Sequence, residues 1–234
     1  MLDRLDLLDL LLPLRCVVCS RGRSSLCDTC RAALPAVPAP GCARCGAPTA
    51  WPVARCRECA GRRLAFARAR AAAAYEGPTR RVMTAWKERG QRTLAREAAA
   101  VVCERIARPH AQGLAFVPAD PGRRFARGHH PAERLAVELA RAWELPCLAV
   151  LVRDRPAPPQ RGLPRAERRR NVEGAFRATA AVPRRLVLVD DVYTTGATAS
   201  AAASALRRAG AREVDVVTFA RTIRTAGLGL GTRR

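Results

Sequence analysis

Residues 186–198 read Leu186-Val187-Leu188-Val189-Asp190-Asp191-Val192-Tyr193-Thr194-Thr195-Gly196-Ala197-Thr198. The first four residues are apolar, which is typical of a strand buried on both faces of a sheet. Two carboxylates follow at the carboxyl end of this strand, where open α/β sheets bind their ligands. A Thr/Gly turn then leads into a helix, and the backbone N–H groups of such a turn suit a phosphate. The stretch therefore predicts an α/β fold with a phosphate-binding loop.

The side chains of this loop are suited to different parts of a ligand. Gly196 lets the backbone approach a ligand closely, and the hydroxyls of Thr194, Thr195 and Thr198 can donate to phosphate oxygens. Asp190 and Asp191 would repel that phosphate. They are placed instead to accept hydrogen bonds from a diol, such as the ribose 2′- and 3′-hydroxyls, or to face Mg²⁺ through water. The alternative is that both acids only cap the turn.

Strand and helix patterns alternate along the rest of the chain. Short apolar runs predict further strands at 66–75, 114–117, 147–152 and 214–220. Helical patterns with typical start and stop residues cover 79–89, 93–107, 131–143 and 198–208, and a short basic helix is expected at 165–171. This alternation predicts a mostly parallel sheet with helices on both faces.

Eight of the ten cysteines precede residue 60 and form four Cys-x-x-Cys pairs. Two thiolates at this spacing converge on one ion, and four of them complete a tetrahedral zinc site. We therefore expect two structural zinc ions, with the first four cysteines on one ion and the last four on the other. Interleaved pairing and redox chemistry are the alternatives. The ligands are Cys16, Cys19, Cys27, Cys30, Cys42, Cys45, Cys56 and Cys59.

The composition changes near residue 62, so we expect a double zinc-ribbon domain at 1–62 and an α/β domain at 63–234. The chain carries a net charge of +22. A field of this sign favours polyanions, either polyphosphorylated substrates or nucleic acid. The longest apolar run near the start, Leu7 to Leu14, contains Asp9 and Pro13 and is too short to span a bilayer. The residues before it do not form a signal peptide. A cytoplasmic protein without a membrane span is expected.

Residues 186–198 resemble the phosphoribosyl-pyrophosphate signature of type I phosphoribosyltransferases. Other stretches resemble the ComF family of competence-associated proteins, and the resemblance extends from about Leu7 to Ala220. The chain departs from that family where it has Arg127-Gly128-His129-His130 in place of Arg-Gly-Phe-Asn. The stretches that carry the resemblance, besides the cysteine block, are Tyr75-Glu76-Gly77-Pro78, Lys87-Glu88-Arg89-Gly90 and Gln160-x-Gly162-Leu163-x-Arg165-x-x-Arg168-Arg169-x-Asn171-Val172.

The resemblance implies a type I phosphoribosyltransferase-like fold and a site for phosphoribosyl pyrophosphate. By this resemblance, Asp190 and Asp191 act on the ribose as catalytic residues, and Lys87 contacts the substrate. Arg123, Arg124 and Arg127 would meet the pyrophosphate, which Mg²⁺ would help to neutralise. The residues implied to hold the 5′-phosphate are Thr194, Thr195, Gly196, Ala197 and Thr198.

The resemblance also implies a role in DNA uptake during natural transformation, with single-stranded DNA and competence proteins as partners. The activity expected from it is phosphoribosyl transfer to an acceptor that the residues do not specify. Two alternatives stay open at this point. The first alternative is a non-catalytic sensor of phosphoribosyl pyrophosphate. The second is an adaptor that handles DNA through its zinc ribbons, and it is compatible with either of the other functions.

Overall fold

The structure, a computed structural model, describes residues 15–119, 130–154 and 174–224. Its main sheet has five strands in the order β1-β7-β6-β2-β3, and all neighbouring pairs are parallel. The central strand β6 carries the acid pair toward the carboxyl end of the sheet. The strands are β1 (Arg68–Ala74), β2 (Leu114–Phe116), β3 (Cys147–Leu148), β6 (Arg185–Tyr193) and β7 (Glu213–Arg221).

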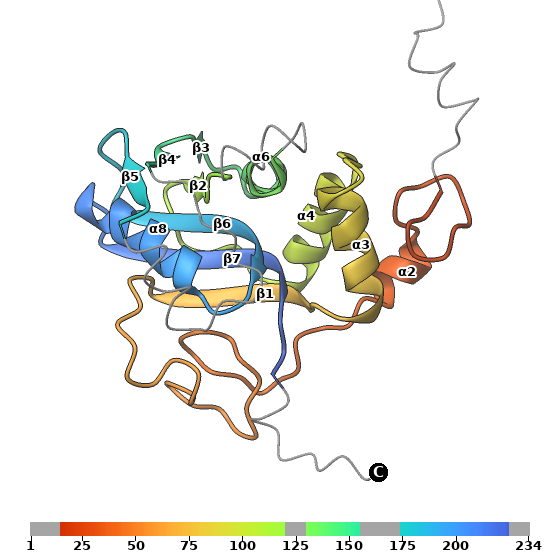
Figure 1. Cartoon of the computed structure of the whole chain (residues 1–234), viewed down its shortest axis with the longest axis horizontal. Coiled ribbons are helices and arrows are strands. Elements are labelled where there is room, and N and C mark those ends of the chain that lie inside the picture. Colours follow the sequence, from red (N-terminus) through yellow and green to blue (C-terminus); the bar gives the residue numbers. More distant parts are fainter. Residues whose placement is uncertain (1–14, 120–129, 155–173, 225–234) are drawn as a thin grey trace, which may run out of the picture.

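Helices cover both faces of this sheet (Figure 1). On one face lie α3 (Gly77–Lys87), α4 (Leu94–Arg105) and α6 (Pro131–Trp143), and on the other lies α8 (Ala197–Arg208). Successive side chains of a strand point to opposite faces. Val187 and Val189 accordingly pack in the core with α6, and Leu186 and Leu188 pack with α8. The predicted fold class, a mostly parallel sheet with helices on both faces, is confirmed.

A second, two-stranded antiparallel sheet joins β4 (Leu151–Arg153) to β5 (Phe176–Ala178). Leu151 and Phe176 belong to the same core as α8. The prediction of one strand over 147–152 is therefore wrong, because β3 pairs with β2 whereas β4 turns away to pair with β5. Both β3 and β4 come from one apolar stretch, so the sequence pattern did not show that the chain changes its pairing partner between them. The strand expected at 186–189 is also longer than predicted, because β6 stays paired with β7 as far as Tyr193.

Helix α6 begins and ends where the sequence pattern placed it. Its first N–H groups have no partner within the helix, and His130 caps them. The backbone N–H of Glu133 donates to Nδ1 of His130 at 2.8 Å. The His130 ring is buried against Phe116, with 5.6 Å between ring centroids. In this structure His130 thus has a capping role.

Two parts of the N-terminal region cover the edge strand β1: the segment between the two cysteine sets and the turn between Cys42 and Cys45. The N–H groups of Ala69 and Ala74 donate to the carbonyl oxygens of Arg44 and Pro35, each at 2.8 Å. Arg105 fastens this segment by donating to Ala72 O at 3.1 Å and Leu34 O at 2.9 Å. An exposed sheet edge invites pairing with other chains, and this cover prevents it.

The two cysteine sets lie on opposite faces of the sheet. Cys16 and Cys30 of the first set pack in the core that contains α3 and α4. All four cysteines of the second set pack in the core that contains α8. The first set also includes the short helix α2 (Asp28–Ala32), which contains Cys30 and which the sequence pattern did not predict. The domain division at residue 62 stays a prediction.

Within the described residues, no helix combines the length and the apolar character needed to cross a bilayer. The run Leu7 to Leu14 and the basic helix expected at 165–171 lie outside the described residues. Arg123, Arg124 and Arg127 lie outside them as well.

Candidate functional site

The structure gathers the eight cysteines into two sets of four. In each set, the four sulfur atoms lie within 4.8 Å of one another. A tetrahedral site with Zn–S bonds of about 2.3 Å separates its sulfur atoms by about 3.8 Å. The Sγ atoms of Cys19 and Cys27 are 3.8 Å apart, and those of Cys42 and Cys59 are 3.6 Å apart. The residues therefore fit two zinc ions, with the sequential pairing that the sequence favoured.

One thiol in each set is prepared for metal binding by its backbone. Burial opposes ionisation, but N–H groups of neighbouring residues lower the pKa of Cys16 to about 6 and that of Cys42 to about 7. The N–H of Cys27 faces Cys16 Sγ at 3.5 Å, and that of Cys56 faces Cys42 Sγ at 3.3 Å. The thiolate is the form that binds zinc, so each set offers a first ligand near neutral pH.

The acid pair on β6 lies beside a single lysine. Lys87, the last residue of α3, places its Nζ 2.7 Å from Oδ2 of Asp191. Asp190 Oδ1 accepts a hydrogen bond of 2.8 Å from the backbone N–H of Asp191. Burial and then the charge of Asp191 raise the pKa of Asp190 to about 7, although Lys87 and Arg153 act in the opposite direction. A partly buried acid with a raised pKa at a strand end, beside a polar pocket, is typical of a functional site.

The loop after β6 has the geometry expected of a phosphate cradle. Gly196 is the N-cap residue of α8 with φ of 70°, a conformation that disfavours other residues. The first N–H group of α8, that of Ala197, donates to the Thr195 hydroxyl at 3.3 Å, and the side chains of Thr194, Thr195 and Thr198 remain at least partly accessible. A small open pocket lies here, lined by the loop, by Asp190 and by Thr218 of β7. The pocket is thus polar and lies at a helix N-terminus, which attracts anions.

Four residues near this site were not singled out by the sequence analysis. Arg153, at the end of β4, stacks on Phe176 at 4.5 Å and is near enough to Asp190 to lower its pKa. Arg62 donates to the loop carbonyl of Thr195, Arg221 lies against the Tyr193 ring, and Glu58 contacts both arginines. Arg153 and Arg221 directly follow predicted strands, and that place was a usable signal for these two. Nothing in the pattern around Arg62 indicated its contact.

Residues 7–60 match the family model of the double zinc ribbon domain. Over nearly its whole length the chain is similar to competence protein F of Haemophilus influenzae, at 29% identity over 88% of this chain and 96% of the relative. It is also similar to the DNA utilization protein YhgH of Salmonella typhimurium, at 28% identity over 78% of this chain and 84% of the relative.

Among solved structures, the chain resembles the glutamine phosphoribosylpyrophosphate amidotransferase of B. subtilis, a structure in complex with ADP and GMP. The identity is 24% and the TM-score 0.37, and the similarity covers 53% of this chain and 26% of that longer one. A TM-score this low carries no functional argument.

The two four-cysteine sets and the matched model show that the chain begins with a double zinc ribbon, followed by a parallel α/β sheet with an acidic site at its carboxyl edge. The chain is a homologue of competence protein F and of the DNA utilization proteins. The predicted resemblance to the ComF family is confirmed.

Zinc content should follow the two cysteine sets. We expect full-length protein purified with zinc to contain about two zinc ions per chain, because each set completes one four-thiolate shell. Cys19→Ser and Cys59→Ser should each retain about one ion. Cys103→Ser is the matched control and should keep both, since Cys103 belongs to neither set. Elemental analysis measures the content, and anaerobically purified protein with disulfides and no metal would contradict the assignment.

The raised pKa of Asp190 should make stability depend on pH in a defined direction. A carboxyl group that holds its proton more tightly when folded destabilises the fold as pH rises above its unfolded value near 4, and the penalty stops growing above about 7. Asp190→Asn removes that penalty while keeping the acceptor Oδ1. Its stabilising effect should be larger at pH 8.5 than at pH 5.5 by roughly 1–2 kcal/mol, because a pKa change of one corresponds to about 1.4 kcal/mol.

Urea unfolding in zinc-saturated buffer at the two pH values measures this difference. Asp154→Asn is the control, because Asp154 is exposed and pairs with Arg177 on the surface. A gain for Asp190→Asn that is equal at both pH values, or larger at pH 5.5, would show that the carboxyl group is not held with a raised pKa.

Proposed function

We propose that the chain binds phosphoribosyl pyrophosphate at the carboxyl end of β6 and serves the uptake or use of DNA. The observation that carries the first half is the acid pair close to the N-terminus of α8, with a polar pocket lined by Asp190 and by the loop that precedes the helix. The second half is supported by the similarity to competence protein F and to the DNA utilization proteins.

The geometry supports separate places for the sugar and its phosphate. The 5′-phosphate would lie at the N-terminus of α8, where the threonine hydroxyls can donate. Asp190 would accept hydrogen bonds from the ribose hydroxyls, since its carboxylate lines the pocket. Lys87 pairs with Asp191, and its positive charge reduces the repulsion between the two acids and an anionic ligand.

Mg²⁺ would enter this site with the ligand. Among the described residues, the clusters of three or more candidate metal ligands are the two cysteine sets, so the acid pair by itself offers too few groups for a dedicated magnesium cage. Mg²⁺ usually combines one or two carboxylates with substrate phosphates and water. Asp190 fits that pattern. The ion would supply neutralisation of the departing pyrophosphate, for which Arg123, Arg124 and Arg127 are the proposed partners.

The reaction that such a site supports is phosphoribosyl transfer. The bond between the anomeric carbon and pyrophosphate breaks, an acceptor attacks that carbon with inversion, and pyrophosphate leaves with its electron pair. This chain's own residues would hold the ribose and exclude water around it. Pyrophosphate release across a panel of bases and amines distinguishes this activity from binding without transfer.

Binding measurements on the acid pair and the cradle test the ligand assignment. Asp190→Asn and Asp191→Asn should each weaken phosphoribosyl pyrophosphate binding by about tenfold or more, because a charge-assisted hydrogen bond contributes roughly 1.5–3 kcal/mol. Gly196→Val should abolish binding of ribose 5-phosphate, because the added side chain would overlap the Tyr193 hydroxyl and ring. Binding of free pyrophosphate should survive that change.

Calorimetry with the three ligands on each variant gives these affinities, with Asp154→Asn as a surface control. If both β6 variants bind phosphoribosyl pyrophosphate as tightly as the unaltered chain, the acids do not hold the ribose and the proposal is wrong.

A nucleic-acid contact is a second proposed activity, and one surface residue favours it. Trp51, on the second zinc ribbon, is 68% exposed, and the exposed Arg55 and Arg57 follow it. An exposed indole with neighbouring arginines suits stacking on an unpaired base. The net charge of +22 would add a sequence-independent attraction to phosphates.

Single-stranded DNA should bind without sequence preference and release steeply as salt rises, because the affinity comes from counterion release. Trp51→Ala should lower the affinity by roughly tenfold, in line with the 1–3 kcal/mol of base stacking on an aromatic ring. Fluorescence anisotropy at several salt concentrations measures both effects. An affinity that is flat between low and physiological salt would refute the electrostatic mechanism.

A further inference from the structure

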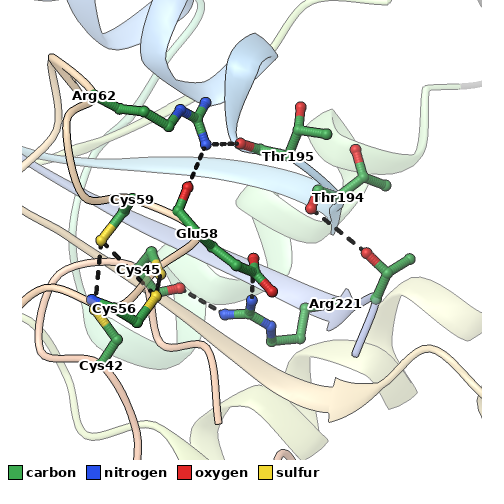
Figure 2. Close-up of polar contacts among 10 residues, drawn as sticks. Cys42, Cys45, Cys56, Glu58, Cys59, Arg62, Thr194, Thr195 and Arg221 are labelled. Carbon is green, nitrogen blue, oxygen red and sulfur yellow. Dashed lines mark hydrogen bonds and ion pairs between the residues drawn. The ribbon is translucent and has the colours of Figure 1, made fainter. Parts of the chain in front are cut away.

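The second zinc ribbon reaches the phosphate loop through Arg62, three residues after Cys59. Nη1 of Arg62 donates to the carbonyl oxygen of Thr195 at 2.7 Å and to that of Glu58 at 3.3 Å. Figure 2 shows this guanidinium between the two carbonyl groups. Glu58 lies between the zinc ligands Cys56 and Cys59, and the Thr195 carbonyl belongs to the peptide just before Gly196. A single side chain thus spans the ribbon and the cradle.

Arg221, the last residue of β7, makes the second connection and depends on the ribbon for its partners. It is only 1% exposed. Its Nη1 donates to Cys45 O at 2.6 Å, and its Nη2 lies 3.6 Å from Oε2 of Glu58. Its Nε and Nη2 have no hydrogen-bond partner among the described protein atoms. A buried cation with so few partners is costly to leave unpaired, so its position follows that of Cys45 and Glu58.

Arg221 passes this constraint to the loop by contact with Tyr193. Its guanidinium lies 5.2 Å from the centroid of the Tyr193 ring. The next residue, Thr222, donates its N–H to Tyr193 O at 3.0 Å and its hydroxyl to Thr194 O at 3.5 Å. The Tyr193 hydroxyl in turn lies against Gly196. Ribbon, arginine, tyrosine and cradle therefore form one continuous packed series.

Two glycines at positive φ make this close packing possible. Gly46, directly after Cys45, has φ of 67°, and a Cβ there would lie 2.6 Å from Ala69 O and 3.5 Å from Nη1 of Arg221. Gly196 has φ of 70°, and a Cβ there would overlap Tyr193. Only glycine fits both positions without displacing the backbone or the rings. A glycine is thus required at each end of this packed series.

We infer that Arg62 and Arg221 are positioning residues, through which the metal-held fold of the second zinc ribbon sets the shape of the phosphate loop. The ligand effect of this inference rests on the proposed binding of a sugar 5′-phosphate, whereas its effect on the free loop does not. Glu58 lies between two zinc ligands, so the metal orients both of its contacts. Without zinc, a region this small does not keep its fold, and Arg62 and Arg221 lose their ribbon partners together.

The first zinc ribbon serves as an internal comparison. It contacts α3 instead, where Nη1 of Arg81 donates to Val18 O at 3.1 Å. Among the described residues, the hydrogen bond that joins a ribbon to the loop 194–198 is the one from Arg62, next to the second ribbon. Losing the first zinc should therefore leave the loop unchanged.

The test compares Arg62→Met with Arg70→Met in the full zinc-loaded chain. Arg70 is a matched control, since its Nη1 also joins the ribbon to the sheet domain, donating from β1 to the ribbon carbonyl of Ala43 at 3.0 Å, but does so away from the loop. Hydrogen exchange of the peptide that contains residues 190–199 reports on the free loop, and calorimetry with ribose 5-phosphate and with pyrophosphate reports on binding. Zinc content is measured in each variant.

Arg62→Met should speed exchange in that peptide and weaken ribose 5-phosphate binding roughly tenfold, or about 1.4 kcal/mol, with pyrophosphate binding unchanged. Arg62→Lys should restore part of both effects, because it returns one donor. Arg70→Met should match the unaltered chain. Equal exchange and equal affinity for Arg62→Met and Arg70→Met would overturn the inference.

The metal itself is tested by comparing Cys59→Ser with Cys19→Ser, each expected to lose one zinc. Faster exchange of the loop in Cys59→Ser alone supports the inference, and equal exchange in the two variants overturns it. Exchange in α6 identifies a variant that has simply unfolded. If the unaltered chain binds no ribose 5-phosphate, the proposed function fails, but the exchange comparison still decides whether the second ribbon positions the loop.

Discussion

The parallel pairing of β6 with β7 is the interaction on which the site depends. It begins at Arg185 and Glu213, passes through the buried apolar residues of both strands, and continues to Tyr193 and Arg221. Because the pairing extends this far, both acids are held within a strand, and their carboxylates cannot separate to relieve the repulsion between them. The same pairing aligns Arg221 beside Tyr193, and so brings the second zinc ribbon to the phosphate loop. Had β6 ended at Val189, the acids would be solvated and the loop independent.

Holding two carboxylates in this place has an electrostatic consequence. Asp191 pairs with Lys87, whereas burial and the charge of Asp191 raise the pKa of Asp190 to about 7. The two acids are therefore not equivalent, because the ion pair is made by one of them and the other lines the pocket. An acid with a raised pKa is a common feature of sites where enzymes handle protons or hydroxyl groups.

Much of this architecture was predictable from the sequence because local patterns encode it. The apolar run before Asp190 and the Pro-initiated helix at 131–143 each have one structural solution, and the Cys-x-x-Cys spacing dictates four-thiolate sites. The contacts between distant segments were not predictable. Nothing about Arg62 distinguishes it from the other forty arginines, since its partner Thr195 is 133 residues away. The split of 147–152 into two strands escaped for the same reason, because partner choice in a sheet depends on the rest of the fold.

The zinc-ribbon region also covers the edge of the sheet. The N–H groups of Ala69 and Ala74 are occupied by the carbonyl oxygens of Arg44 and Pro35. If the ribbons open, β1 becomes a free edge rich in alanine and available for pairing with another copy of the chain. Zinc would then have a protective role that is separate from any ligand, because the metal-held ribbons keep this edge covered against aggregation.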